Sequence, residues 1–416
     1  MNRTLLAGLA AALAALVLAP AALAAEREFV PGNVIVNYAD DSSAAQRAQA
    51  RQAAGVLERL SVVRGVGGAQ VVSIDGGVKA AVARLERSPA VEYAEPNFIY
   101  RSQAVPDDPR FDELWGLDNT GQTGGTPDAD IDAPEGWDVL GLGSFPLTGG
   151  AKIGIVDTGI RQNHADLVGK TVDCGGVNNF GINLIIIIIG SDPTIVNGKC
   201  NDDNGHGTHV AGTAAAIADN GTGVAGVAFN SPLAICKALN SGGSGTLQMV
   251  ANCIDWTSDR DADIISMSLG GPGSQTLETA VENATANGSL LIAAAGNSGN
   301  SSVSFPAGYA EVVSVAATDH NDQRASFSQF NADVEIAAPG VNILSTWNNG
   351  GYNTISGTSM STPHVSGVAA LIAAGNPGGG PAAWRTELQA AVDDLGAPGR
   401  DPQFGFGRVN LSKVTP

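Results

Sequence analysis

The sequence predicts an α/β fold, in which a parallel sheet carries helices on both faces, preceded by a smaller α+β unit. Beyond residue 105, near-continuous apolar segments of strand length alternate with helical segments rich in small residues. Strands that are apolar on both sides are typical of parallel sheets covered on both faces. Before residue 105 the pattern differs, and a Pro- and Asp-rich stretch at residues 105–109 indicates an exposed connector between the two parts.

The N-terminal unit, residues 28–101, shows a βαββαβ-like order. We expect a strand at 33–38 and a helix at 43–53, and further on a strand at 69–74, a helix at 78–87 and a strand at 91–100. By itself this pattern indicates only a small α+β domain of unknown purpose.

In the second part, the apolar pattern predicts six strands and five helices. The strands are expected at residues 152–157, 233–239, 263–269, 290–297, 312–318 and 334–338. The helices are expected near 208–218, 246–259, 275–287, 361–374 and 382–394. Ligands of such sheets bind at the carboxyl ends of the strands. Polar residues stand there in three cases, namely Asp157, residues 268–271 and Asn297.

The first 24 residues are predicted to be an export signal. Arg3 supplies the positive end, residues 5–18 the apolar stretch, and residues 22–24 a small-residue cleavage site. A membrane anchor is the alternative, but the apolar run is shorter than the roughly 20 residues needed to cross a bilayer. The five isoleucines at 185–189 are also too short, and indicate a buried strand or an aggregation-prone patch. We therefore expect a secreted, extracellular protein without membrane association.

The formal net charge of -19 is concentrated beyond residue 105. An acidic surface repels nucleic-acid phosphates and anionic lipid, so we expect neither as a partner, whereas cations are favoured. A monomer is the default expectation.

The four cysteines, Cys174, Cys200, Cys236 and Cys253, would meet an oxidising compartment after export. Pairing of Cys174 with Cys200 and of Cys236 with Cys253 is preferred, because each bond closes a short local loop. One disulfide with two free thiols is possible as well. The spacing does not match a zinc site.

Peptide hydrolysis without a metal needs a nucleophile, a base, an acid that orients the base, and donors for the oxyanion. The base would be one of five histidines. His206 and His209 follow a glycine-rich turn into a helix, so His206 is expected at its exposed start and His209 in the packing. Alone, a surface histidine is the commoner interpretation. A zinc pair is also conceivable, although the glutamate of the metalloprotease motif is missing.

A second turn into a helix carries Ser359. Pro363 is tolerable in the first turn of that helix, which places Ser359 at the helix N-terminus, where N–H groups gather. A plain serine N-cap would explain the residue equally, and Asp157 could be only a carboxylate at a strand end.

Three segments, Asp157-Thr158-Gly159, His206-Gly207-Thr208-His209 and Gly357-Thr358-Ser359-Met360, occur in this order. Together they resemble the signature segments of the subtilisin family, closest to its thermitase-like branch. The resemblance covers essentially all of residues 105–416. It implies a subtilisin-like peptidase domain at 105–416, with a signal peptide at 1–24. Residues 25–104 resemble the propeptide of such enzymes, a small α+β domain of ferredoxin-like type that acts as an intramolecular inhibitor and assists folding.

By this resemblance, Ser359 is the nucleophile, His206 the general base and Asp157 the residue that orients the imidazole. Asn297 matches the side-chain oxyanion donor of the family. The expected substrate-binding residues include two walls of the S1 pocket, which admits the substrate side chain before the cut bond, and Ser304 at its floor. These residues are Ser268, Leu269, Gly270, Gly271, Ala294, Gly296 and Ser304. A small neutral floor favours large apolar side chains, and main-chain pairing with an extended substrate favours broad specificity.

The resemblance also implies a structural calcium ion. Asp108, Asp166 and Asn220 match the side-chain ligands of the strong thermitase-like site, and Ile217, Thr222 and Val224 match its carbonyl donors. The alternative is a mere polar turn around residues 219–223. Asp202 and Asp203 are considered as a second, weaker site or as solvated carboxylates.

We therefore expect a secreted serine endopeptidase of protein and peptide substrates, working at neutral to alkaline pH and needing no cofactor for catalysis. Self-cleavage between about residues 100 and 108 would remove the propeptide. A scaffold protein with a vestigial site and an exported esterase are the alternatives from other classes. The first of these lacks support, since the catalytic positions hold the required residue types.

Overall fold

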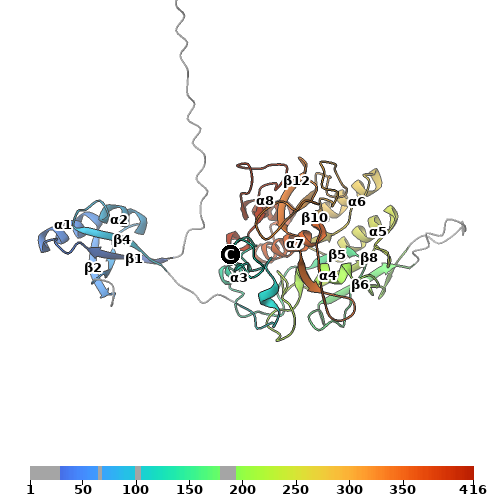
Figure 1. Cartoon of the computed structure of the whole chain (residues 1–416), viewed down its shortest axis with the longest axis horizontal. Coiled ribbons are helices and arrows are strands. Elements are labelled where there is room, and N and C mark those ends of the chain that lie inside the picture. Colours follow the sequence, from blue (N-terminus) through green and yellow to red (C-terminus); the bar gives the residue numbers. More distant parts are fainter. Residues whose placement is uncertain (1–28, 64–67, 99–104, 179–193) are drawn as a thin grey trace, which may run out of the picture. The chain divides into compact units, whose positions relative to one another are not determined.

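The computed structural model describes residues 29–63, 68–98, 105–178 and 194–416. The expected signal peptide and the isoleucine run at 185–189 lie outside the described residues. The chain divides into two compact units, Met1–Arg101 and Ser102–Pro416, each with a hydrophobic core of its own (Figure 1). We describe the two units separately.

The first unit is a four-stranded antiparallel sheet with two helices, in the strand order β2-β3-β1-β4. Its elements are β1 (Phe29–Tyr38), α1 (Ala44–Ala54), β2 (Val56–Val62), β3 (Gln70–Ile74), α2 (Val78–Leu85) and β4 (Val91–Phe98). Helix α1 begins with a capping box between Ser43 and Gln46 and ends at Gly55, whose φ of 74° is left-handed. The expected βαββαβ order is confirmed. Strand β2, for which no limits were expected, is largely exposed, so it lacks a buried apolar pattern.

The second unit contains a ten-stranded sheet in the order β15-β16-β12-β11-β10-β9-β5-β8-β6-β7. Neighbouring strands are parallel except for β7 and β15, which pair antiparallel at the two edges. The strands are β5 (Ile153–Asp157), β6 (Thr171–Val177), β7 (Ile195–Asn197), β8 (Leu233–Lys237), β9 (Ile264–Met267), β10 (Leu290–Ala294), β11 (Val312–Thr318), β12 (Val334–Pro339), β15 (Val392–Asp393) and β16 (Arg408–Val409). A separate hairpin joins β13 (Ile343–Thr346) and β14 (Tyr352–Ile355).

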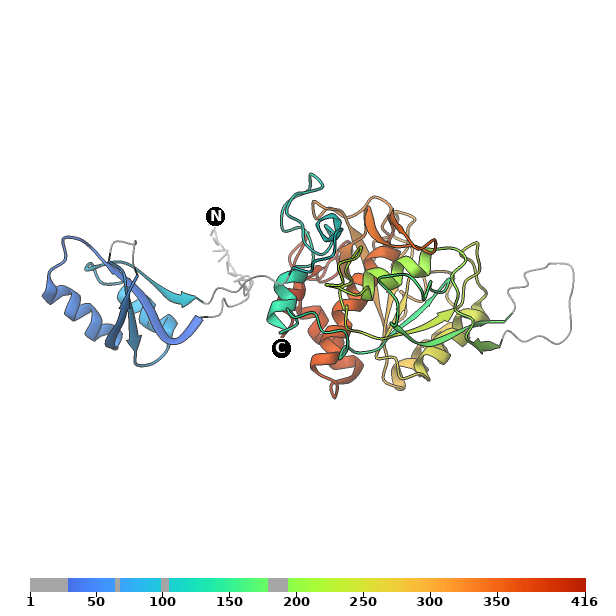
Figure 2. The ribbon, with the colours of Figure 1, turned by 90° about the horizontal axis from the view of Figure 1, so that it is seen from below.

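Helices cover both faces of this sheet, as Figures 1 and 2 show. Alternate residues of the strands face different cores: Ile153 and Ile155 pack with the helices at 206–215 and 358–375, whereas Val156 packs with the helices at 247–258 and 275–286. The helices are α3 (Ala133–Val139), α4 (His206–Ala215), α5 (Leu247–Ser258), α6 (Gln275–Ala286), α7 (Thr358–Gly375) and α8 (Gly380–Ala390), with short 3₁₀ turns η1 (Phe111–Glu113) and η2 (Leu411–Lys413). The expected fold class is confirmed.

All six expected strands and five expected helices of this unit are present, but the limits of two helices differ from the expectation. The helix expected at 382–394 is α8, which ends at Ala390, and residues 392–393 form strand β15. The other is α7. The helix begins at Thr358 rather than near residue 361, so Pro363 lies inside it and not in its first turn. Proline has no N–H to donate, which leaves the carbonyl of Ser359 without its helical partner. The helix survives this loss because the side chain of Ser268 donates to that carbonyl at 2.8 Å.

All four cysteines are paired, Cys174 with Cys200 and Cys236 with Cys253, which confirms the preferred connectivity. No helix in the described part of the chain is long and apolar enough to cross a membrane. The carboxyl ends of β5, β9 and β10, which are neighbours in the order β10-β9-β5, deliver Asp157, Ser268 and Asn297 to one edge of the sheet.

Candidate active site

Asp157 is the last residue of β5 and is fully buried. Its Oδ1 accepts a hydrogen bond from the main-chain N–H of Thr158 at 2.6 Å. His206 Nδ1 lies 2.8 Å from Oδ1 and 3.0 Å from Oδ2 of the same carboxylate. Because a carboxylate only accepts, Nδ1 carries the proton and Nε2 of the neutral ring is left as an acceptor.

His206 is the first residue of α4, after the N-cap Gly205. Gly205 has a φ of 116°, and a Cβ there would lie 2.4 Å from the indole of Trp347, so only glycine fits this turn. Burial by itself lowers the pKa of His206, but the charge and hydrogen bond of Asp157, with the charge of Asp202, outweigh it and raise the pKa above 6.5. The ring is a quarter exposed, so its free face is open to a substrate.

His209 is drawn into the packing, as expected, and is fully buried. One ring nitrogen, Nε2, lies 3.0 Å from the carbonyl of Ile343. Burial lowers the pKa of His209 to about 3, so the ring is neutral at physiological pH. Within the described ranges, no cluster of three or more His, Cys, Asp or Glu side chains is placed to hold a metal ion. The ring of His206 contacts Asp157, whereas that of His209 contacts the carbonyl of Ile343.

Ser359 is the second residue of α7, next to the N-terminus of the helix. Its hydroxyl donates to the carbonyl of Ser268 at 3.2 Å, while the hydroxyl of Ser268 donates to the carbonyl of Ser359. Two hydrogen bonds thus join the segment after β9 to the start of α7. In this arrangement the hydroxyl of Ser359 is not bonded to His206.

Asn297 follows β10 and is oriented by Thr358 at the start of α7. The Oδ1 of Asn297 accepts from Thr358 N at 2.8 Å and from Thr358 Oγ1 at 3.0 Å. The amide Nδ2 is therefore the group left to donate to a ligand. A Cβ on Gly357 would lie 3.4 Å from this Nδ2 and 3.6 Å from the N of Ser359. The missing side chain of Gly357 leaves a hollow that faces two N–H donors.

A cavity of about 250 Å³ adjoins Asn297 and Ser359. Five of the seven expected substrate-binding residues line it: Leu269, Gly270, Ala294, Gly296 and Ser304. Ser268 and Gly271 line a neighbouring cavity instead. The N–H and C=O of Gly271 are both bonded to Phe305, so the edge left for an extended peptide lies before Gly271.

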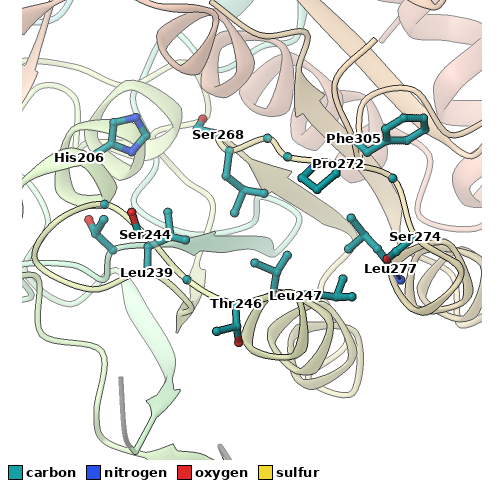
Figure 3. Close-up of a pocket in the computed structure, with 18 of the residues that line it drawn as sticks. His206, Leu239, Ser244, Thr246, Leu247, Ser268, Pro272, Ser274, Leu277 and Phe305 are labelled. Atoms are coloured by element: carbon teal, nitrogen blue, oxygen red, sulfur yellow. Dashed lines mark hydrogen bonds between the residues drawn. The ribbon is translucent and has the colours of Figure 1, made fainter. Parts of the chain in front are cut away.

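The neighbouring cavity has a volume of about 590 Å³ and starts at His206. Figure 3 shows His206 at one end and Leu277 and Phe305 at the other, with Leu247 along the side. These apolar residues were not predicted to line a cavity, because the local pattern places each of them only in a helix or a loop. Two polar residues were likewise not predicted: Gln329, which lines the smaller cavity, and Thr358, which orients Asn297.

The expected calcium ligands Asp108, Asp166 and Asn220 converge. Asn220 N donates to Asp108 Oδ1, and Asn220 Nδ2 donates to Asp166 Oδ1, each at 3.3 Å. Among the residues that the structure describes, Asn220 Oδ1 is buried without a hydrogen-bond partner. Burial raises the pKa of Asp108, and the charge of Asp166 adds to the rise. A buried oxygen without a donor beside two carboxylates fits a hard cation.

Asp202 and Asp203 do not form the second cation site that was considered. Both oxygens of Asp202 accept hydrogen bonds from protein donors. Asp203 is bonded to Lys237 Nζ at 2.7 Å.

Comparison with known proteins agrees with this geometry. The sequence model of the subtilase family matches residues 148–407, which is more than half of the chain. The chain belongs to the subtilase family. A second model, that of the fervidolysin N-terminal prodomain, matches residues 16–97. Subtilases are serine endopeptidases, so this chain is a serine-type endopeptidase with an N-terminal prodomain.

Individual relatives span most of the subtilase chain. Thermitase of Thermoactinomyces vulgaris is 43% identical over 285 residues, which cover 68% of this chain and 93% of thermitase. The thermophilic serine proteinase of Bacillus sp. strain AK1 is 36% identical over 384 residues, 92% of this chain and 86% of that protein. The solved structure of sphericase aligns with a TM-score of 0.58 and 35% sequence identity. The aligned part covers 66% of this chain and 97% of the sphericase chain. The thermitase-like assignment is confirmed.

Proposed function

We propose that residues 105–416 form a secreted endopeptidase of broad specificity, which cleaves proteins through an acyl-enzyme intermediate on Ser359. The observation that carries this proposal is the 2.8 Å contact between His206 Nδ1 and Asp157 Oδ1. His206 lines the larger cavity, which shares Leu269 and Gly270 with the smaller cavity lined by Asn297 and Ser359. The export pattern of residues 1–24 supports secretion.

In the first step, the Ser359 hydroxyl exchanges the Ser268 carbonyl for His206 Nε2 as its acceptor. The oxygen then attacks the carbonyl carbon of the substrate while its proton moves to Nε2. Asp157 keeps the Nδ1 proton in place and stabilises the imidazolium. The negative oxygen that forms would accept from Asn297 Nδ2 and from the N–H of Ser359, over Gly357.

The imidazolium then gives its proton to the leaving amine, and a water molecule, activated by His206, releases the acyl group from Ser359. Main-chain groups of residues 268–270 would pair with the extended substrate. Such pairing reads backbone shape rather than side-chain identity, which supports broad specificity. The smaller cavity would accept the residue before the cleaved bond.

A serine-directed fluorophosphonate tests this mechanism. The reagent should modify Ser359 and abolish casein digestion, and Ser359→Ala should not be labelled. Labelling of a different residue would refute the assignment. A high ratio of peptide to simple ester turnover would separate the endopeptidase from an esterase.

We further propose that residues 25–104 are an inhibitory propeptide, removed by self-cleavage between about residues 100 and 108. The match to a prodomain over residues 16–97 supports this division. Purified Ser359→Ala protein should stay at full length, and added active enzyme should process it. Efficient maturation of the purified variant alone would contradict self-cleavage.

A calcium ion held by Asp108, Asp166 and Asn220, with carbonyl oxygens of Ile217, Thr222 and Val224, is proposed as a structural partner. Such an ion supplies positive charge that holds the N-terminal segment of the peptidase unit to the loop after α4. At a calcium concentration 100 times the Kd, it would stabilise the fold by about 2.7 kcal/mol.

Melting of the inactive Ser359→Ala protein with and without calcium measures this effect. Asp166→Asn should abolish the calcium-dependent rise in Tm, whereas Asp107→Asn, an exposed neighbour bonded to Gly221 N, should keep it. An equal rise in both variants would refute the site.

A further inference from the structure

The carboxylate of Asp202 joins the strand that carries Asp157 to the helix that begins with His206. It is buried, with 6% of its surface exposed. Oδ1 accepts from the side chain of Thr158 and from the N–H groups of Asn204 and Gly205, each at 2.9 Å. Oδ2 accepts from Thr208 N at 3.0 Å and from Thr208 Oγ1 at 2.6 Å. Five donors thus bind one carboxylate. One donor follows Asp157 in the chain, and the other four lie in the turn and first residues of the helix around His206.

Thr158 completes the connection. Its hydroxyl, which donates to Asp202, also accepts from Gly207 N at 2.8 Å, one residue after His206. Its main-chain N–H donates to Asp157 Oδ1, and its carbonyl accepts from Lys237 Nζ at 2.6 Å. The relative position of the Asp157 carboxylate and the first turn of α4 therefore depends on two side chains, Thr158 and Asp202.

A disulfide holds the segment that carries Asp202. Cys200 is bonded to Cys174, and its carbonyl accepts from Ile160 N at 2.7 Å. Asp202 N in turn donates to the carbonyl of Ile160 at 3.3 Å. A Cβ on Gly159 would lie 2.5 Å from the carbonyl of Cys200, so the two chains lie in direct contact. The segment is anchored on both sides of the turn into α4.

We propose that Asp202 is a positioning residue that sets the distance between the Asp157 carboxylate and His206, and that the Cys174–Cys200 disulfide holds its loop in place. This inference rests on the proposed function, in which His206 is the general base. Asp202 touches no substrate and acts through Thr158 and the turn before His206.

The charge of Asp202 adds a second effect. Burial by itself raises the pKa of Asp202, but hydrogen bonds from Thr208, Gly205 and Asn204 outweigh it and lower the pKa, so the side chain is ionised. Its charge raises the pKa of His206, together with the larger effect of Asp157, and His209 on the same helix is neutral. Loss of the Asp202 charge should therefore lower the pKa that limits activity at acidic pH.

The test compares Asp202→Asn with Asp203→Asn in the matured enzyme. Asp203 is the adjacent carboxylate, half-exposed and bonded to Lys237, so its variant is a matched control. Rates are expressed per fluorophosphonate-labelled molecule, which counts only folded enzyme. Asp202→Asn should lower kcat about 10- to 100-fold at unchanged KM, as expected for a misplaced catalytic group, and shift the acid limb of kcat/KM to lower pH. Asp203→Asn should change kcat less than twofold.

Thr158→Val provides an independent arm if Asp202→Asn does not fold. It removes the hydroxyl link but leaves the Asp202 charge, so kcat should fall while the acid limb keeps its position. Wild-type kcat in either Asp202→Asn or Thr158→Val, or an equal loss in Asp203→Asn, would overturn the proposal. Failure of the wild-type enzyme to be labelled at Ser359 would instead refute the proposed function itself.

Discussion

Removing the Cys174–Cys200 disulfide with the double substitution Cys174→Ala and Cys200→Ala should lower both stability and turnover. The bond joins residues 26 positions apart. Closing a loop of this length restricts the unfolded chain by about 3.5 kcal/mol at 25 °C, and the variant loses this contribution. With an unfolding entropy of about 2.1 cal/mol/K per residue over the peptidase unit, Tm should fall by about 5 °C.

The second disulfide provides the control. Cys236–Cys253 spans 17 positions, so Cys236→Ala with Cys253→Ala should cost about 3.1 kcal/mol and lower Tm almost equally. Cys236 lies in β8, which is held between β5 and β6 whether or not the bond is present. We therefore expect kcat to stay near the wild-type value in this variant. It should fall in the variant without Cys174–Cys200, because that disulfide anchors the loop of Asp202.

Stability is measured by calorimetry in the Ser359→Ala background, because active enzyme would digest its own unfolded chains. Turnover is measured at 25 °C, well below Tm, in otherwise wild-type enzyme. Equal kcat values in the two disulfide variants, together with the expected fall in Tm, would refute the role assigned to Cys174–Cys200.

Four further predictions concern residues in and around the candidate active site. Asn297→Leu should lower kcat about 10²- to 10³-fold with little change in KM, and steady-state kinetics would measure this. The range is the one known for loss of the corresponding donor in subtilisin. Gly357→Ala should lower kcat at least about tenfold, since a methyl group would fill the hollow between the two N–H donors, while melting of the variant should be near normal. The pKa of His206 is raised, so kcat/KM should fall as pH drops through a midpoint above 6.5, and a pH–rate profile with a lower midpoint would contradict this. The Ser361 hydroxyl is buried without a partner among the described residues, so Ser361→Ala should raise the free energy of unfolding by about 1 kcal/mol at unchanged kcat.

The elements that were predicted well are those whose signal is local. The apolar run at 312–318 is strand β11, Val312–Thr318, without any correction of its limits. The expected helix at 246–259 is α5 with both of its caps, since Thr246 caps its start and Asp259 its end. In both cases the types of neighbouring residues indicate burial or capping, so a short window of sequence predicts where the element begins and ends.

Elements whose stability depends on distant partners were missed. The hairpin of β13 and β14 was not expected, nor were the two outermost strands at each end of the sheet, β6 and β7 at one end and β15 and β16 at the other. The start of α7 was also misplaced, because Pro363 is accommodated by the side chain of Ser268, 95 residues earlier in the chain. No local pattern reports such a contact.

By itself the sequence determined the fold class and the side chains available for chemistry, and it favoured the disulfide pairing that the structure has. Residue type and neighbouring glycines made Asp157, His206 and Ser359 candidates, whereas their roles, and that of Asn297, came from the resemblance to the subtilisin family. Only the tertiary structure decided which groups hold them: Asp202 and Thr158 between strand and helix, Thr358 on Asn297, and the empty space over Gly357. These hydrogen bonds join residues 44 to 61 positions apart and arise from packing of the whole core, which no short stretch of sequence specifies.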